Sequence, residues 1–159
     1  MSTPEVTLRP ATDADLEFLL QVYAATRAEE LAQVPWSVEQ KDAFLRQQFG
    51  AQHAWWHEHY IGTTFDLVLV HGEPAGRFYV HHGPTDIRVV DIALLPPYRG
   101  TGIGSRLLRE LFAEGDAAGK RVSVHVEKFN PARRLYERLG FQEVEDKGLY
   151  LLMAREPRK

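Results

Sequence analysis

The chain has 159 residues, of which 44% are hydrophobic and 26% charged, and its formal net charge is −3 with the histidines neutral. These proportions are typical of one globular domain, and a slightly acidic chain lacks the basic field that attracts nucleic acid or an anionic membrane. The absence of cysteine excludes disulfides, thiolate metal sites and a cysteine nucleophile. No run reaches the roughly 20 apolar residues of a membrane span, and residues 1–5 lack a signal-peptide pattern, so we expect a cytoplasmic protein.

The N-terminal third predicts one strand followed by two helices. Residues 5–9 alternate polar and apolar side chains, as a strand does. Thr12 is a suitable cap for a helix that we expect to run to about Leu31. Residues 37–40 form a capping box for a second helix, whose end within 53–60 the pattern leaves open.

The middle of the chain changes to strand patterns. Two strand-like runs at 65–70 and 77–80 flank a turn sequence, which predicts a hairpin. A third run at 87–95 is rich in β-branched residues and stops at Pro96-Pro97, because proline cannot donate to a β-ladder.

The remaining part alternates helices and strands. The helix, strand, short helix and two closing strands are expected at 103–118, 122–126, 131–139, 141–144 and 149–153. The predicted order is β-α-α-β-β-β-α-β-α-β-β. Helices between strands favour parallel crossovers and neighbouring strand runs favour antiparallel pairs. We therefore expect an α/β protein, a single domain over residues 1–159, with a central mixed sheet and helices on both faces.

A glycine-rich loop lies between the third strand run and the helix that follows it. Its sequence is Arg99-Gly100-Thr101-Gly102-Ile103-Gly104. Glycines at alternate positions before a helix leave several N–H groups free to face one anion, and the helix dipole adds to the attraction. Ser105-Arg106 does not match a P-loop, and the glycine spacing does not match a dinucleotide fingerprint. A phosphate site and a glycine turn without ligand stay open at this point.

Two motifs together resemble the GNAT acetyltransferase superfamily. The first is Arg99-x-x-Gly102-x-Gly104, preceded by Pro-Pro-Tyr and followed by an apolar helix, which is similar to the family's Q/R-x-x-G-x-G/A signature. The second is the block 130–141, similar to N-x-x-A-x-x-L-Y-x-x-x-G-F, with its alanine one place nearer the asparagine. The resemblance extends from about Val6, is strongest over 87–141 and is weak in the two N-terminal helices.

The resemblance implies acetyl-CoA as co-substrate. Because the chain has no cysteine and no His-Glu-x-x-His motif, we expect no metal. In this family the strand before the glycine loop parts from the next strand, here 122–126, and the pantetheine arm lies between them. The loop would hold the pyrophosphate. The cofactor contacts implied in this way are Ile92, Ala93, Leu94, Arg99, Gly100, Thr101, Gly102, Ile103, Gly104 and Asn130. Asn130 stands before a proline and is also a good helix cap.

Three catalytic roles are implied as well. Tyr136 matches the family's tyrosine near the sulfur and is the expected general acid, although it could simply pack in its helix. The N–H group of Leu94 is expected to stabilise the oxyanion. Asp91 is the first candidate for the base and His125 the second, while a structural role for Asp91 stays open.

The function implied is an N-acetyltransferase that moves an acetyl group from acetyl-CoA to a primary amine of a small molecule or peptide, by direct attack in a ternary complex. An acyl-CoA-binding sensor without turnover is the alternative. The two N-terminal helices usually shape the acceptor pocket in this family. Their carboxylates and aromatic rings would suit a cationic amine, and a core or dimer contact is the competing interpretation. A homodimer stays open on fold-level analogy.

Overall fold

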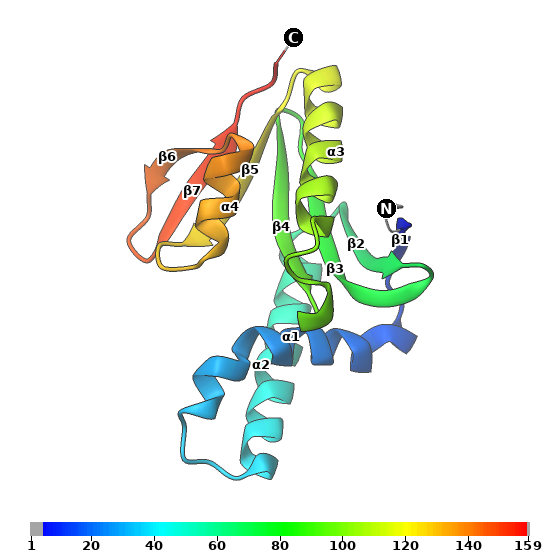
Figure 1. Cartoon of the computed structure of the whole chain (residues 1–159), viewed down its shortest axis with the longest axis vertical. Coiled ribbons are helices and arrows are strands. Elements are labelled where there is room, and N and C mark those ends of the chain that lie inside the picture. The colour runs from blue at the N-terminus through cyan, green and yellow to red at the C-terminus, as the bar shows by residue number, and fades with distance from the viewer. Residues whose placement is uncertain (1–4, 159) are drawn as a thin grey trace. The chain divides into compact units, whose positions relative to one another are not determined.

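The computed structural model describes residues 5–158 (Figure 1). Residues 1–4, on which the signal-peptide prediction partly rests, and residue 159 lie outside the described residues. The helices and strands are β1 (Val6–Pro10), α1 (Leu16–Ala32), α2 (Val38–His59), β2 (Thr63–Val70), β3 (Glu73–His82), β4 (Asp86–Leu94), α3 (Ile103–Ala118), β5 (Arg121–Glu127), α4 (Ala132–Leu139), β6 (Gln142–Asp146) and β7 (Tyr150–Arg155). Short 3₁₀ turns precede α1 at Asp13–Asp15 and follow β4 at Pro96–Tyr98.

The strands form a seven-stranded sheet in the order β1-β2-β3-β4-β5-β7-β6. β4 and β5 are parallel, whereas β1–β2, β5–β7 and β6–β7 are antiparallel. The sheet is therefore mixed, and the predicted α/β class and element order are confirmed. In the part of the chain that the structure describes, no helix is long and apolar enough to cross a membrane.

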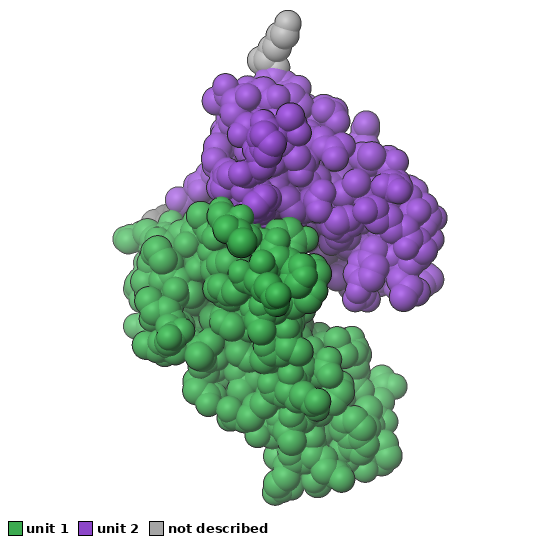
Figure 2. Space-filling view, turned by 180° about the vertical axis from the view of Figure 1, so that it is seen from behind, with its two compact units in different colours: residues 1–78, 93–98 green, residues 79–92, 99–159 purple. Residues whose placement is uncertain are grey.

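The chain divides into two compact units (Figure 2). The first comprises residues 1–78 and 93–98, and the second comprises residues 79–92 and 99–159. The first therefore holds β1, α1, α2 and β2, and the second holds α3, β5, α4, β6 and β7. A single domain over the whole chain stays a prediction.

In the first unit, side chains close the starts of both helices. The Asp15 carboxylate accepts hydrogen bonds from both terminal nitrogens of Arg9 at 2.9 Å and from the Thr12 N–H at 2.8 Å. The bond from Arg9 is the main reason that the pKa of Asp15 falls to about 2. At the start of α2, Ser37 and Gln40 bond each other's backbone N–H groups in the capping box expected from the sequence.

In the second unit, α3 packs closely on β5. Its inward residues are buried, as the apolar pattern predicts: Ile103, Leu107, Leu108, Leu111 and Phe112. A Cβ at Gly115 would lie 2.7 Å from the Lys120 carbonyl oxygen and 3.2 Å from the Val122 side chain. Glycine is therefore required for this approach, since a methyl group would push helix and strand apart.

Two glycine substitutions test this packing. Gly115→Ala should destabilise the protein by about 1–3 kcal/mol, because the new methyl group overlaps with backbone. Gly50→Ala is the matched control, since Gly50 lies in α2 with nothing within 4 Å of its Cβ position. It should stabilise the protein by about 0.5–1 kcal/mol through helix propensity. Urea denaturation measures both, and equal effects of the two substitutions would contradict the close approach of α3.

Candidate functional site

The glycine loop has the backbone geometry of an anion site. Gly100 has φ of 69° and Gly102, the N-cap of α3, has φ of 86°, so both occupy the left-handed region that favours glycine. The Arg106 N–H donates to the Gly102 carbonyl at 3.0 Å. By helix geometry the N–H groups of residues 103–105 have no acceptor within the helix. The exposed loop therefore presents backbone donors at the positive end of the helix dipole.

The parallel pairing of β4 and β5 ends near this loop. Residues 86–89 pair with 121–124, yet β4 continues to Leu94 and β5 to Glu127. Ile92 lies in the continuation of β4, and its Cδ1 is 4.0 Å from the Cβ position of Gly104. The start of α3 and the part of β4 that continues beyond its pairing with β5 therefore adjoin each other.

Tyr136 is brought to the same region from α4. Its side chain is 6% exposed, and its ring contacts Phe141 at 5.4 Å between centroids. Burial raises the pKa of Tyr136 to about 12, and the charge of Asp91 adds to the shift. The hydroxyl therefore keeps its proton at neutral pH. The general-acid role of Tyr136 and the base role of Asp91 stay predictions.

Asn130 has the capping role that the sequence left open. Its side-chain oxygen accepts a hydrogen bond from the Ala132 N–H at 2.9 Å. We expected Pro131 to be the first helical residue, but α4 begins at Ala132 and Pro131 is its N-cap. The predicted start of the helix is therefore one residue too early. A contact between Asn130 and the pantetheine arm stays a prediction.

Ala93 and Leu94, the last residues of β4, belong to the first unit. There the Leu95 N–H donates to the Ala75 carbonyl at 2.8 Å. A Cβ at Gly76 would overlap with the Ala93 carbonyl oxygen, so glycine allows a very close approach of the two backbones. This packing fixes the backbone at Ala93 and Leu94, and the oxyanion role of the Leu94 N–H stays a prediction.

A polar network on β4 and β5 was missed in part by the sequence analysis. Arg88 contacts His125 and Ser123, and Ser123 contacts Asp86. Only His125 was singled out from the sequence. The available signal is alternation, because Asp86 and Arg88 on one strand and Ser123 and His125 on its parallel partner point to one face of the sheet.

The rings on one side of α2 belong to the packing of the first unit. His53 stacks on Phe49 at 5.5 Å and lies 4.3 Å from His57, which stacks on Phe65 of β2 at 3.9 Å. Burial lowers the pKa of His53. These residues are therefore held by one another, which favours the core interpretation for this side of the helix. Among the described residues, no group of three or more His, Asp or Glu is placed to hold a metal.

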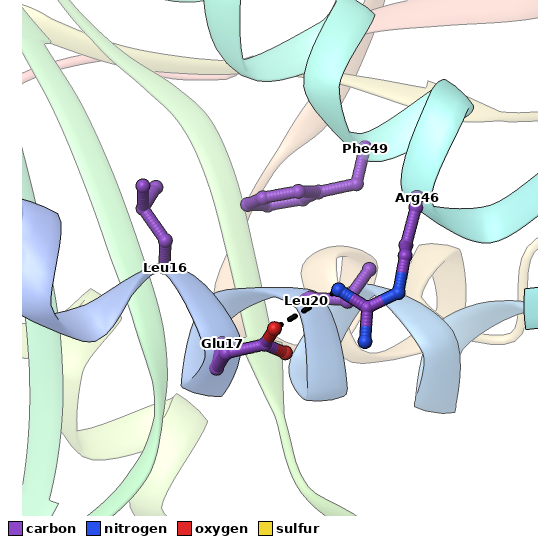
Figure 3. A pocket seen from close by; sticks show the side chains of 5 residues that line it. All are labelled: Leu16, Glu17, Leu20, Arg46 and Phe49. Atoms are coloured by element: carbon purple, nitrogen blue, oxygen red, sulfur yellow. Dashed lines mark hydrogen bonds and ion pairs between the residues drawn. The ribbon is translucent and has the colours of Figure 1, made fainter. Parts of the chain in front are cut away.

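A small pocket lies where α1 and α2 cross (Figure 3). Its volume is about 130 Å³, and an ion pair of 2.9 Å between Arg46 and Glu17 spans it. The lining residues are Leu16, Glu17, Leu20, Arg46 and Phe49. Arg46 is also bonded to Asp42 at 2.9 Å, so its charge is compensated twice and it is poorly placed to bind a further anion.

A family model matches most of the chain, including the loop. The model of the acetyltransferase (GNAT) family matches residues 25–141, which include β4, the glycine loop, α3, β5 and α4. The chain belongs to the GNAT acetyltransferase family. It is thus a member of a family of acyltransferases, and the resemblance recognised in its two motifs is confirmed.

Curated relatives match parts of the chain. Mycothiol acetyltransferase of Thermobifida fusca is 32% identical over 105 residues, which are 65% of this chain and 31% of that protein. A putative [ribosomal protein bS18]-alanine N-acetyltransferase of Bacillus subtilis is 33% identical over 112 residues, 68% of this chain and 65% of that protein. The chain thus spans between about a third and two thirds of the length of these relatives.

Solved structures share the fold at low identity. The crystal structure of PaiA N-acetyltransferase from Thermoplasma acidophilum, in complex with coenzyme A, has a TM-score of 0.72 and 18% identity, and the match covers 96% of this chain and 99% of that one. The ribosomal-protein-S18-alanine N-acetyltransferase of Escherichia coli has a TM-score of 0.62 and 21% identity, with 96% and 94% covered. These likenesses establish the fold.

The raised pKa of Tyr136 predicts a loss of stability in alkali. Between pH 10 and about 12 the tyrosine ionises in the unfolded chain but not in the folded one, so unfolding is favoured as pH rises. The free energy of unfolding of the native protein should fall by roughly 2–3 kcal/mol relative to Tyr136→Phe over this interval. Urea denaturation at pH 9 and pH 12 measures the difference. Parallel alkaline losses in the two proteins would show that Tyr136 is not buried.

Proposed function

We propose that this chain is an N-acetyltransferase that moves the acetyl group of acetyl-CoA to a primary amine. The observation that carries the proposal is one arrangement in the second unit. The glycine loop adjoins the part of β4 that continues beyond its pairing with β5, and the charge of Asp91 on that part of the strand adds to the burial that raises the pKa of Tyr136. Because the chain belongs to the GNAT acetyltransferase family, we interpret this arrangement as a site for acetyl transfer.

The glycine loop fits the pyrophosphate of coenzyme A. A Cβ at Gly100 or at Gly102 would meet no atom within 4 Å, so the space in front of the loop is open. The N–H groups of residues 103–105 and the exposed Arg99 are donors of the kind that bind phosphate oxygens. Thr101 lies between the two glycines and is part of the same surface. Backbone groups of Ile92, Ala93 and Leu94 would hold the pantetheine arm, together with Asn130.

When bound, acetyl-CoA supplies an activated acetyl thioester. Asp91 accepts a proton from the amine, directly or through water, so that the nitrogen lone pair can attack the carbonyl carbon. The Leu94 N–H stabilises the negative charge on the carbonyl oxygen. As the C–N bond forms and the C–S bond breaks, Tyr136 would give its proton to the departing sulfur, and the resulting phenolate would take up the second proton that leaves the nitrogen. The products are an acetamide and coenzyme A with its thiol restored.

The acceptor is proposed to be a primary amine of a small molecule or of a peptide. The names of two relatives support both classes, since one is a mycothiol acetyltransferase and the other a putative [ribosomal protein bS18]-alanine N-acetyltransferase. The aromatic rings on the sheet side of α2 pack against one another and against β2. They therefore give less support for a cationic acceptor than the sequence alone suggested.

Replacement of Gly102 tests the cofactor site. Gly102→Val should abolish binding of coenzyme A in calorimetry, because a branched side chain is strained at φ of 86° and would stand in the loop. Gly72→Val is the matched control: Gly72 also has a positive φ, of 79°, and open space around its Cβ position, but it lies in the β2–β3 turn. The control should lose stability and keep binding. Equal affinity in both variants would rule out the loop as the pyrophosphate site.

Removal of the Tyr136 hydroxyl tests the general acid. Tyr136→Phe should lower kcat by about 100-fold with little change in KM, because the proton for the sulfur is lost while the packing of the ring remains. Thiol release with a panel of primary amines measures the rate, and Tyr150→Phe, at an exposed tyrosine on β7, is the control. Unchanged turnover would remove Tyr136 as the acid. Binding of coenzyme A without turnover on any amine would favour the sensor.

A further inference from the structure

The geometry points to a specific task for His125: its Nε2–H group donates a hydrogen bond to an oxygen of the acceptor beside the amine, and Arg88 is the positioning residue that holds the ring in this tautomer. The inference deepens the proposed function and rests on it for the identity of the reaction. It narrows the acceptor to primary amines that carry a carbonyl or carboxylate oxygen next to the amino group, and it removes His125 as a general base.

The tautomer follows from the donor and acceptor capacities of the two side chains. Nη1 of Arg88 lies 3.2 Å from Nδ1 of His125. A guanidinium group has only donors, so the nitrogen that faces it must accept. Nδ1 therefore carries no proton, the imidazole is neutral, and its single N–H is at Nε2. A base must offer a lone pair, and at Nε2 the ring offers a proton instead.

Arg88 is itself held by a directed chain of hydrogen bonds. Its Nε donates to Oγ of Ser123 at 2.7 Å, and that hydroxyl donates to Oδ2 of Asp86 at 2.7 Å. The other carboxylate oxygen of Asp86 accepts from Nε of Arg121 at 2.8 Å. Ser123 is fully buried, so the chain is shielded where it passes between the strands. The guanidinium is thereby fixed, with Nη2 3.7 Å from Oδ2 of Asp86 and Nη1 facing His125.

The position of His125 places it on the side of β5 that α3 and α4 do not cover. Val122, Val124 and Val126 are buried, and the Val122 side chain adjoins α3 at Gly115. His125 points to the opposite face because side chains alternate along a strand, and it is exposed. It is also the first residue of β5 beyond the pairing with β4. An acceptor that lies beside the end of β5 on this face meets the imidazole.

The charges around His125 agree with a neutral donor. Burial lowers its pKa most, and Arg88 and Lys147 lower it further, while Asp86 and Glu145 act in the opposite direction. Protonation of Nδ1 would bring a second positive charge against Arg88. The two nearby cations also favour an oxygen with partial or full negative charge as the partner of the Nε2–H group.

Nuclear magnetic resonance of ¹⁵N-labelled protein tests the tautomer without any substrate. At pH 7.5, long-range ¹H–¹⁵N spectra should show His125 neutral and protonated at Nε2. His59 is an internal control that should show the other tautomer. Its Nδ1 lies 2.9 Å from the Trp55 carbonyl oxygen, and because that oxygen can only accept, the proton of His59 should be on Nδ1. In Arg88→Met the signal of His125 should shift toward a mixture of tautomers, with that of His59 unchanged. A proton on Nδ1 of His125 in the native protein would overturn the inference.

Matched amines test the contact with the acceptor. The probes are phenylalaninamide, which has an oxygen beside the amine, and phenethylamine, which lacks it. The ratio of kcat/KM for the two should fall about three- to tenfold in His125→Phe, as expected for one lost hydrogen bond, and should recover in His125→Gln, whose amide N–H can replace Nε2–H. Because every variant is assayed with the same two amines, their difference in basicity does not affect the comparison of the ratio between variants.

The outcomes separate the inference from the proposed function. If all three proteins turn over with the same ratio, the inference fails and the proposed function stands. If His125→Phe and His125→Gln both lose the ascending limb of the pH–rate profile between pH 6 and 8, His125 is a base and the inference fails. If the native protein acetylates no amine, the proposed function fails, and the acceptor contact fails with it.

Discussion

The short parallel pairing between β4 and β5 is the constraint on which the candidate site depends. Only residues 86–89 and 121–124 are paired, so both strands carry further backbone N–H and C=O groups beyond the ladder. Where two strands part in this way, an extended ligand with amide groups can lie between them and bond to their backbones. The paired end is secured twice, by the contact of Gly115 with Val122 and by the bonds between Asp86, Arg121 and Ser123. One end of the strand pair is thus rigid and the other is open.

The two faces of this strand pair have different chemistry. On one face α3 and α4 bury Val122, Val124 and Tyr136, and the low-polarity surroundings keep the phenol protonated. On the other face Arg88 and His125 provide hydrogen-bond donors in contact with water. In the proposals above, Tyr136 on the first face donates a proton to the sulfur, and His125 on the second face contacts an oxygen of the acceptor.

The sequence predicts the helices and strands well because prolines and glycines mark many of their ends. Prolines 96 and 97 end β4, Gly119 and Gly140 end α3 and α4 with left-handed backbone, and the alternation of 122–126 is that of a half-buried strand. Features that depend on distant partners were not predictable. The end of β4–β5 pairing is a matter of register, and the tautomer of His125 depends on Arg88, which is 37 positions away. The sequence also could not show whether the aromatic rings of α2 form a substrate surface or pack in the core, because this depends on their contacts with β2.

The proximity of Asp91 and Tyr136 links the two proton transfers of the proposed reaction. Burial is the main cause of the raised pKa of Tyr136, and the charge of Asp91 adds to it. In the proposed reaction Asp91 takes a proton from the amine, which removes its negative charge and this smaller contribution. Proton uptake at Asp91 would therefore make proton donation by Tyr136 to the sulfur easier, while the larger effect of burial stays in place.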